Sequence, residues 1–166
     1  ELPFTSGLAI TPGRNIGWYT VRDGSLINVV GHVQGSEWAE EGWSIRSEPG
    51  AVPQLFADAH PAFQRILRAA PEGSFYKWGL FTHPPLERWS SARVTLVGDA
   101  AHAMLPFMGM GAAMAVEDGY VLARCLAQVP DAGRALRTYE RTRLERANFV
   151  QAESAAKAAR LEGRDA

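Results

Sequence analysis

The chain has 166 residues, of which 46% are hydrophobic, 16 are glycine and 10 are proline. This composition is typical of a globular unit of ordinary size and excludes disorder, collagen and coiled coil as descriptions of the whole chain. With 17 basic and 18 acidic side chains the formal charge is -1, so bulk charge gives no reason to expect a nucleic acid or an anionic membrane as a partner.

The sequence also carries indications of the compartment. Its apolar stretches are shorter than the roughly 18 residues that a membrane-spanning helix needs. Cys125 is the single cysteine and cannot form an internal disulfide, and the sequence contains no N-glycosylation sequon. An export signal is not expected, because no basic segment followed by an apolar segment comes after Glu1. These features predict a cytoplasmic protein that does not enter the membrane.

A β-hairpin is the first element predicted along the chain. The β-rich runs 16–21 and 26–30 flank Arg22-Asp23-Gly24-Ser25, and Asp-Gly tolerates the positive φ of a tight turn. Between 52 and 70, apolar residues recur every three or four positions, which is the helical period. Because His60-Pro61 interrupts this pattern, we expect two short helices there.

Strands and longer helices are predicted in the remainder of the chain. The aromatic-rich run 75–81 indicates a strand, and the β-branched run 93–97 indicates a buried strand that stops at Gly98-Asp99. A helix is expected from Gly111 up to Val129-Pro130, and a longer one from the N-cap Asp131 towards Arg160. The residues expected on the packed faces of these helices are Ala115, Gly119, Leu122 and Leu126 in the first and Leu136, Tyr139, Ala147 and Val150 in the second.

A glycine-rich segment precedes the first of these long helices. Gly109-Met110-Gly111 begins like the dinucleotide fingerprint G-x-G-x-x-G, but the third glycine position is Met114 and the predicted strand ends too early, at Gly98. A classical Rossmann site is therefore not favoured. A glycine-rich turn still exposes backbone N–H groups at a helix start, where the helix dipole amounts to about half a positive charge. We therefore expect this helix start to stabilise a nearby anion.

Asp99 directly follows the predicted strand, where a side chain can reach a ligand at the sheet edge. Two other interpretations stand beside this one. Asp99 is suited to capping the next turn, and with His102 three residues later it invites comparison with a hydrolase triad. The triad has little support, because the chain has no G-x-S-x-G elbow. The histidines and the cysteine show no metal-ligand spacing, so no metal site is predicted.

The run from Arg93 to His102, RVTLVGDAAH, resembles the GD-motif segment of flavin-dependent aromatic hydroxylases, in particular the salicylate-hydroxylase-like branch. The GD segment is specific, and the similarity extends over most of the chain. The other residues that carry it are Lys77-Trp78-Gly79-Leu80-Phe81, Pro85-Leu86, Trp89, Leu105-Pro106-Phe107, Gly109, Gly111-Ala112, Glu117-Asp118, Tyr139-Glu140, Arg143, Arg146 and Val150-Gln151.

This resemblance implies a partial FAD/NAD(P)-binding flavoprotein hydroxylase fold, of the α+β or α/β class. Residues 1–91 would form the later part of a substrate-binding domain, with the hairpin. Residues 92–166 would form the C-terminal part of an FAD-binding domain, with a strand, a glycine-rich loop and two helices. The resemblance further implies that Asp99 hydrogen-bonds the ribityl chain of FAD, while the loop beside it lies along the isoalloxazine ring. The implied cofactor-binding residues are Asp99, Pro106, Gly109, Met110, Gly111 and Ala112.

The activity that the resemblance implies is hydroxylation of a small aromatic acid or phenol. In such enzymes NAD(P)H reduces FAD, and dioxygen supplies the oxygen atom that is delivered to the ring. Phe81, His83 and Phe107 are candidates for substrate contact, and no catalytic base is identified. The family commonly has Gln where this chain has Met110, so a soft apolar side chain replaces a polar contact near the flavin.

Parts of the family pattern have no counterpart in this sequence. These are the N-terminal strand-turn-helix with G-x-G-x-x-G, its acidic ribose partner, and the later Asp-Gly motif; the Asp23-Gly24 pair belongs to the hairpin turn. We therefore interpret the chain as the C-terminal half of such an oxygenase and expect it to bind FAD poorly by itself. An N-terminal half, a second chain or a homo-oligomer is expected to cover its open apolar faces. The alternative is a truncated relative without catalysis that acts as a binding or assembly module.

Overall fold

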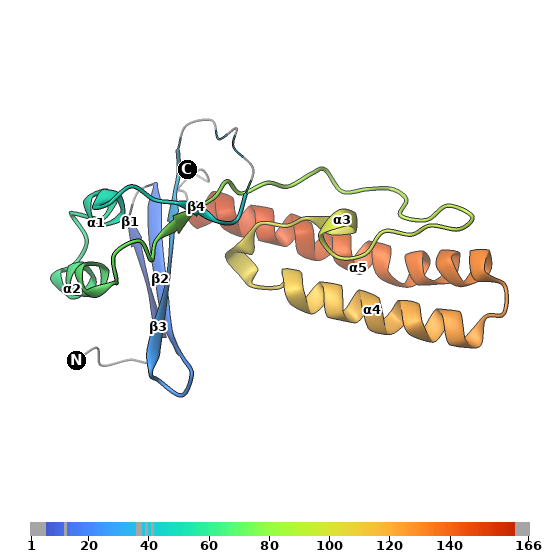
Figure 1. The fold of residues 1–166 in the computed structure, drawn as a ribbon. Coiled ribbons are helices and arrows are strands. Elements are labelled where there is room, and N and C mark those ends of the chain that lie inside the picture. The colour runs from blue at the N-terminus through green and yellow to red at the C-terminus, as the bar shows by residue number, and fades with distance from the viewer. Residues whose placement is uncertain (1–5, 12, 36–37, 39, 41, 162–166) are drawn as a thin grey trace. The chain divides into compact units, whose positions relative to one another are not determined.

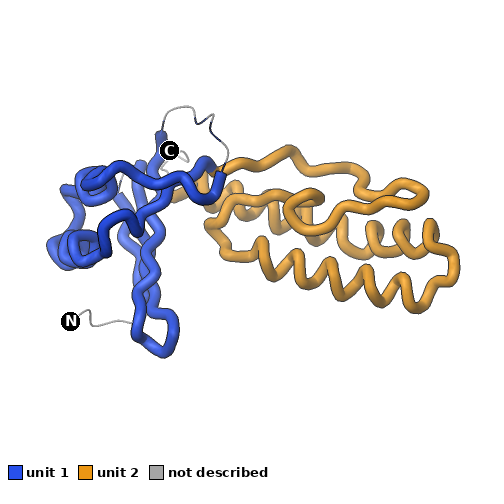
Figure 2. The backbone as a smooth tube through the Cα atoms, in the orientation of Figure 1, with its two compact units in different colours: residues 1–79 blue, residues 80–166 orange. Residues whose placement is uncertain are grey.

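The chain forms two compact units, residues 1–79 and 80–166 (Figure 2). A computed structural model describes residues 6–11, 13–35, 38, 40 and 42–161. In its described residues the first unit has two small β-sheets and two short helices, and the second unit is built around two long helices (Figure 1).

A three-stranded antiparallel sheet forms the larger part of the first unit. Its strands are β1 (Ser6–Thr11), β2 (Arg14–Val21) and β3 (Leu26–Val33), in the order β1-β2-β3. The predicted hairpin is confirmed as β2 and β3, and in its turn Arg22 and Asp23 have φ values of 50° and 52°. The strand β1 was not predicted; it extends the hairpin on the β2 side.

The two short helices predicted after the hairpin are confirmed as α1 (Ala51–Leu55) and α2 (Pro61–Ala69). His60 is the N-cap of α2, and its side chain accepts the N–H of Ala62 at 3.2 Å. The apolar side of α2 packs on the sheet, and the buried residues of this core are Ile16, Phe56, Phe63 and Leu67. Of the strand predicted over 75–81, two residues pair: β5 (Tyr76–Lys77) with β4 (Ile45–Arg46).

In the second unit two long helices lie side by side (Figure 1). They are α4 (Gly111–Gln128) and α5 (Ala132–Leu161), and both are confirmed as predicted. The carboxylate of Asp131 accepts the N–H of Arg134 at 2.8 Å, as an N-cap does. Two shorter pieces precede α4: helix α3 (Asp99–His102) and the 3₁₀ turn η1 (Pro106–Met108).

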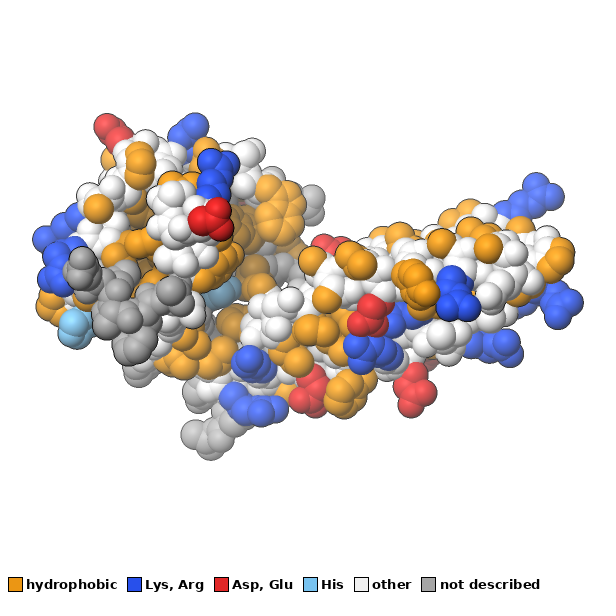
Figure 3. All heavy atoms as spheres, turned by 90° about the horizontal axis from the view of Figure 1, so that it is seen from below, with side chains coloured by type: hydrophobic (Ala, Val, Ile, Leu, Met, Phe, Trp, Pro, Cys, Tyr) orange, Lys and Arg blue, Asp and Glu red, His pale blue; other side chains and the backbone are white. Residues whose placement is uncertain are grey.

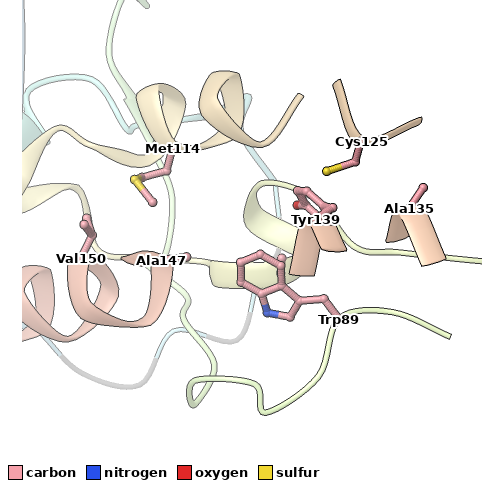
Figure 4. Close-up of a cluster of buried hydrophobic side chains, with 8 residues drawn as sticks. Trp89, Met114, Cys125, Ala135, Tyr139, Ala147 and Val150 are labelled. Atoms are coloured by element: carbon pink, nitrogen blue, oxygen red, sulfur yellow. The ribbon is translucent and has the colours of Figure 1, made fainter. Parts of the chain in front are cut away.

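The core of the second unit lies between α4, α5 and the segment that carries Trp89 (Figure 4). The predicted inner face of α5 is confirmed, because each of its four residues is buried. The fully or nearly buried members of this core are Trp89, Ala101, Met114, Cys125, Ala135, Tyr139, Ala147 and Val150.

Two predictions for the second unit are wrong. The run 93–97 is not a buried strand: the structure gives it an isolated bridge between Ser90 and Thr95, and Val94 is 64% exposed. The buried face of α4 passes through Met114 and Asp118, whereas Gly119 and Leu126 are exposed. None of the described helices is long and apolar enough to cross a membrane.

Candidate cofactor site

A pocket of about 520 Å³ lies in the second unit, between α3, the η1 turn and the first turns of α4. It brings together five of the six cofactor-binding residues that the resemblance implies. The sixth, Met110, does not line the pocket; its side chain packs against the hydrophobic core. The lining residues are Asp99, Met104, Leu105, Pro106, Gly109, Gly111, Ala112 and Ala115.

The loop around this pocket is shaped by proline and glycine. Pro106 is the first residue of η1, and Gly109 ends the turn with a φ of 65° while donating its N–H to the Pro106 carbonyl at 2.9 Å. Because a residue with a side chain rarely adopts this φ, the position favours glycine. The loop therefore turns into α4 at Gly109, and Gly109, Gly111, Ala112 and Ala115 contribute no large side chain to the pocket lining.

The start of α4 presents main-chain donors to the pocket. The N–H of Met114 bonds to the Met110 carbonyl at 2.9 Å, so the three preceding N–H groups have no partner within the helix. No side chain in the described part of the chain caps this end, and its first turn has no acidic residue. The positive end of the helix dipole is therefore available to a ligand with negative charge.

Asp99 is the first residue of α3 and is exposed at the pocket wall. An ionised carboxylate only accepts hydrogen bonds, so at this place it suits a ligand with hydroxyl groups. The pocket thus combines an acceptor at one side with uncapped N–H groups at another.

A buried polar network is centred on Asp118 of α4. Asp118 and His102 are fully buried and Arg143 is 3% exposed. The Asp118 carboxylate accepts hydrogen bonds from His102 Nε2 at 2.6 Å, from Arg143 Nε at 2.8 Å and from the Gly98 N–H at 2.9 Å. Burial alone would raise the pKa of Asp118, but the bonds from Arg143, Gly98 and His102 outweigh it and the pKa is lowered. The carboxylate is therefore ionised.

Glu117 extends this network to the edge of the helices. Its carboxylate accepts two hydrogen bonds from Arg146, each 2.8 Å long, and one from Arg143 Nη1 at 2.5 Å. The bonds from Arg146 are the main reason that the pKa of Glu117 is lowered to about 2; Arg143 adds to this effect and burial opposes it. One arginine, Arg143, therefore joins two neighbouring carboxylates of α4 to α5.

The loop that enters the pocket is also held by α5. Gln151 Nε2 donates to the carbonyls of Ala103 at 2.8 Å and His83 at 2.9 Å, and Ser154 Oγ donates to the Leu105 carbonyl. Thr82 Oγ1 donates to the Ala103 carbonyl at 2.7 Å. The backbone leading to the pocket wall is thus fixed by side chains from distant parts of the second unit.

The three residues suggested for substrate contact do not line this pocket. Both ring nitrogens of His83 have partners: Nδ1 lies 2.8 Å from the Pro84 carbonyl, and Nε2 accepts the Ala103 N–H at 3.3 Å. Phe81 is 54% exposed, and Phe107 is partly buried within η1. Their contact with a substrate stays a prediction.

Sequence reasoning noted Glu117-Asp118 and Arg143 but did not predict the network that they form. A signal was present in the helical pattern: Asp118 falls four residues after Met114 on the buried face of α4. A carboxylate at such a position needs a buried cation as partner, and Arg143 lies on the buried face of α5.

The chemistry of the pocket fits FAD. The Asp99 carboxylate can accept hydrogen bonds from ribityl hydroxyls, and the uncapped start of α4 can face the edge of the flavin ring that becomes negative on reduction. The small side chains at positions 111 and 112 leave room for a flat ring beside the helix start.

Comparison with known proteins places this chain among FAD-binding proteins. The family described as FAD binding domain matches residues 54–154. The chain is 35% identical over 144 residues to a 3-amino-4-hydroxybenzoate 2-monooxygenase of Streptomyces platensis, covering 86% of this chain and 36% of that protein. It is 43% identical over 109 residues to a 6-hydroxynicotinate 3-monooxygenase of Bordetella bronchiseptica, covering 64% of this chain and 28% of the relative.

A solved salicylate hydroxylase in complex with its substrate has the same fold over 93% of this chain, with a TM-score of 0.78 and 28% sequence identity. The match covers 40% of that chain. The present chain thus spans about a third of the length of the curated relatives that it matches. The predicted resemblance and the partial flavoprotein hydroxylase fold are confirmed by these relatives, which are aromatic monooxygenases. The chain itself belongs to the FAD binding domain family.

Proposed function

We propose that this chain supplies the flavin-ring side of the FAD site in a monooxygenase that hydroxylates a small aromatic acid or phenol. One observation carries the proposal: a single pocket gathers Asp99, the glycine loop and the uncapped start of α4. The relatives' printed activities on hydroxybenzoate and hydroxynicotinate compounds support the substrate class. NAD(P)H as the reductant, dioxygen as the oxidant and a cytoplasmic location belong to the same proposal.

Each part of the pocket has a role in this reaction. Asp99 binds and orients the ribityl chain by accepting its hydroxyl hydrogens. The first turn of α4 places N–H groups and the positive end of the helix dipole beside the edge of the flavin ring that becomes negative on reduction. Met104, Leu105 and Pro106 form an apolar wall that excludes water from one side of the ring. Bound FAD supplies hydride acceptance and oxygen activation.

The ADP half of FAD requires further polypeptide in this proposal. The chain covers 36% of the Streptomyces relative. The described residues contain no strand-to-helix turn with a G-x-G-x-x-G pattern, because the glycine loop before α4 follows the η1 turn and not a strand. Large apolar side chains are also exposed along the helices of the second unit (Figure 3). On α4 the exposed fractions are 73% for Val116, 63% for Tyr120 and 50% for Leu126. We infer that an N-terminal half or a second chain covers them.

The experiment that tests this function supplies the missing part. The portion of the Streptomyces relative that precedes its match is joined to this chain, and the fusion and the isolated chain are each incubated with FAD and desalted. We expect about one flavin per fusion protein, little flavin on the isolated chain, and NAD(P)H oxidation by the fusion that is stimulated by aromatic acids. A fusion that folds, as judged by circular dichroism, but retains no flavin contradicts the proposal.

Flavin retention without any NAD(P)H oxidation is the second informative result. It would favour the alternative of a binding or assembly module that keeps the cofactor site without the reaction. The absence of a dinucleotide fingerprint in the sequence is the observation that keeps this alternative in the test.

A further inference from the structure

One carboxylate oxygen holds both ends of helix α3. Asp118 Oδ2 accepts the N–H of Gly98, the N-cap of α3, at 2.9 Å, and the Nε2 hydrogen of His102, its last residue, at 2.6 Å. Asp99 lies between these two anchors. A side chain from α4 thus fixes the whole of the short helix that carries the candidate flavin ligand.

The second oxygen of the same carboxylate is held by α5. Asp118 Oδ1 accepts from Arg143 Nε at 2.8 Å, and Arg143 Nη2 also lies 3.4 Å from the Met114 carbonyl. A buried carboxylate is costly unless it is paired and fully hydrogen-bonded. The partners of Asp118 meet this condition, so its orientation is tightly determined.

The conformation that Asp118 stabilises is an unusual one. Gly98 has φ 58° and ψ −138°, a region that residues with a side chain rarely adopt. Its N–H is bonded to the buried Asp118 carboxylate, and α3 begins at the next residue, Asp99. Without the acceptor on Asp118 this N–H would be a buried donor with no partner, and the turn would have a reason to rearrange.

We propose that Asp118 is the positioning residue of the turn at Gly98 and Asp99. Held by Arg143, the Asp118 carboxylate sets the direction of Asp99 towards the pocket. The placement of the turn stands on the contacts above. Its consequence for FAD rests on the proposed function.

The test uses the full 166-residue chain labelled with nitrogen-15, without FAD. Amide hydrogen exchange and chemical shifts of Gly98 and Asp99 are measured by NMR in the wild type and in Asp118→Asn. We expect the Gly98 amide to be protected in the wild type. In Asp118→Asn its exchange should be faster by about 10- to 100-fold, the range for a lost charge-assisted hydrogen bond, and the Asp99 amide should shift.

Glu117→Gln is the matched control, because Glu117 binds the same Arg143 but does not touch Gly98. The control should raise the Gly98 exchange rate much less than Asp118→Asn does and should leave the Asp99 shift as in the wild type. Equal changes in both variants would mean a general loosening of the helices and would overturn the positioning role.

One further outcome is decisive. A Gly98 amide that exchanges as fast as an exposed one in the wild type overturns the inference, whether or not Asp118→Asn folds. This measurement contains no flavin, so its failure is separate from failure of the fusion protein to retain FAD. If the positioning role and the proposed function both hold, the fusion with Asp118→Asn should retain less FAD than the fusion with Glu117→Gln.

Discussion

The carboxylate of Glu140, on α5, lies 2.5 Å from the main-chain nitrogen of Ser90 and accepts its N–H. The same oxygen accepts the N–H of Trp89 at 2.6 Å, and Tyr139 Oη donates to the Leu96 carbonyl at 3.1 Å. The extended segment before Gly98 therefore has its main chain bonded to side chains of α5.

This arrangement predicts that Glu140→Ala destabilises the second unit. The substitution leaves two N–H groups without their charged acceptor, which costs about 1–3 kcal/mol. Urea unfolding followed by circular dichroism measures the change in the free energy of unfolding. Glu145→Ala is the control, since Glu145 is exposed on the same helix. Equal stability of the two variants would contradict a structural role for Glu140.

The elements that were predicted correctly have local causes. Asp23-Gly24 fits the positive φ of the β2–β3 turn, and Asp131 caps α5 within three residues of itself. The packed face of α5 follows from spacing alone. Local chemistry is sufficient in these cases because the residues that decide the structure are neighbours in the chain.

The run 93–97 shows where local reasoning fails. Its β-branched composition favours extended backbone, but a strand needs a neighbour, and in the described residues its pairing is the bridge between Ser90 and Thr95. The hydrogen-bond network of Asp118 could not be predicted from local patterns either. Its partners Arg143 and Gly98 lie 25 and 20 residues away in the sequence. Spacing along one helix indicates that a partner is needed but does not identify it.

Acid should weaken the contact between α4 and α5. The pKa of Glu117 is lowered to about 2 from 4.5 in the folded chain, mainly by Arg146, and that of Asp118 is also lowered. In the unfolded chain these two carboxylates take up protons at a higher pH than in the folded chain. The stabilisation that the ionised carboxylates contribute is therefore fully present above about pH 4.5 and is lost as the pH falls towards 2. We expect the free energy of unfolding to decrease through this window.

Glu117→Gln checks the assignment of this pH dependence. The variant should be less stable than the wild type at pH 6, and its stability should fall less steeply between pH 4.5 and 2. Unfolding by urea at a series of pH values measures both. Parallel pH curves for the two proteins would show that Glu117 does not contribute to the acid sensitivity.

Two glycines of the second unit should respond in opposite ways to substitution by alanine. At Gly98, φ is 58° and an added Cβ would lie 3.2 Å from the Cβ of Ala115, so Gly98→Ala should cost about 1–3 kcal/mol. Gly119 is helical, and an added Cβ there meets no atom within 4 Å, so Gly119→Ala should stabilise by about 0.5–1 kcal/mol. Urea unfolding of both variants tests the pair, and stabilisation by Gly98→Ala would disprove the strained turn.

Alanine substitutions at Asp99 and Asp131 should have opposite effects on FAD affinity and on the free energy of unfolding. Asp99 is exposed at the pocket wall, so Asp99→Ala should change the free energy of unfolding by less than about 0.5 kcal/mol. In the fusion protein it should weaken FAD binding by about 10- to 100-fold, because the ribityl hydroxyls lose a charged acceptor. Asp131→Ala removes the cap of α5 and should do the reverse: it costs about 1 kcal/mol of stability and leaves FAD affinity unchanged. Flavin fluorescence titration and urea unfolding measure the two quantities, and wild-type FAD affinity in Asp99→Ala would remove Asp99 from the site.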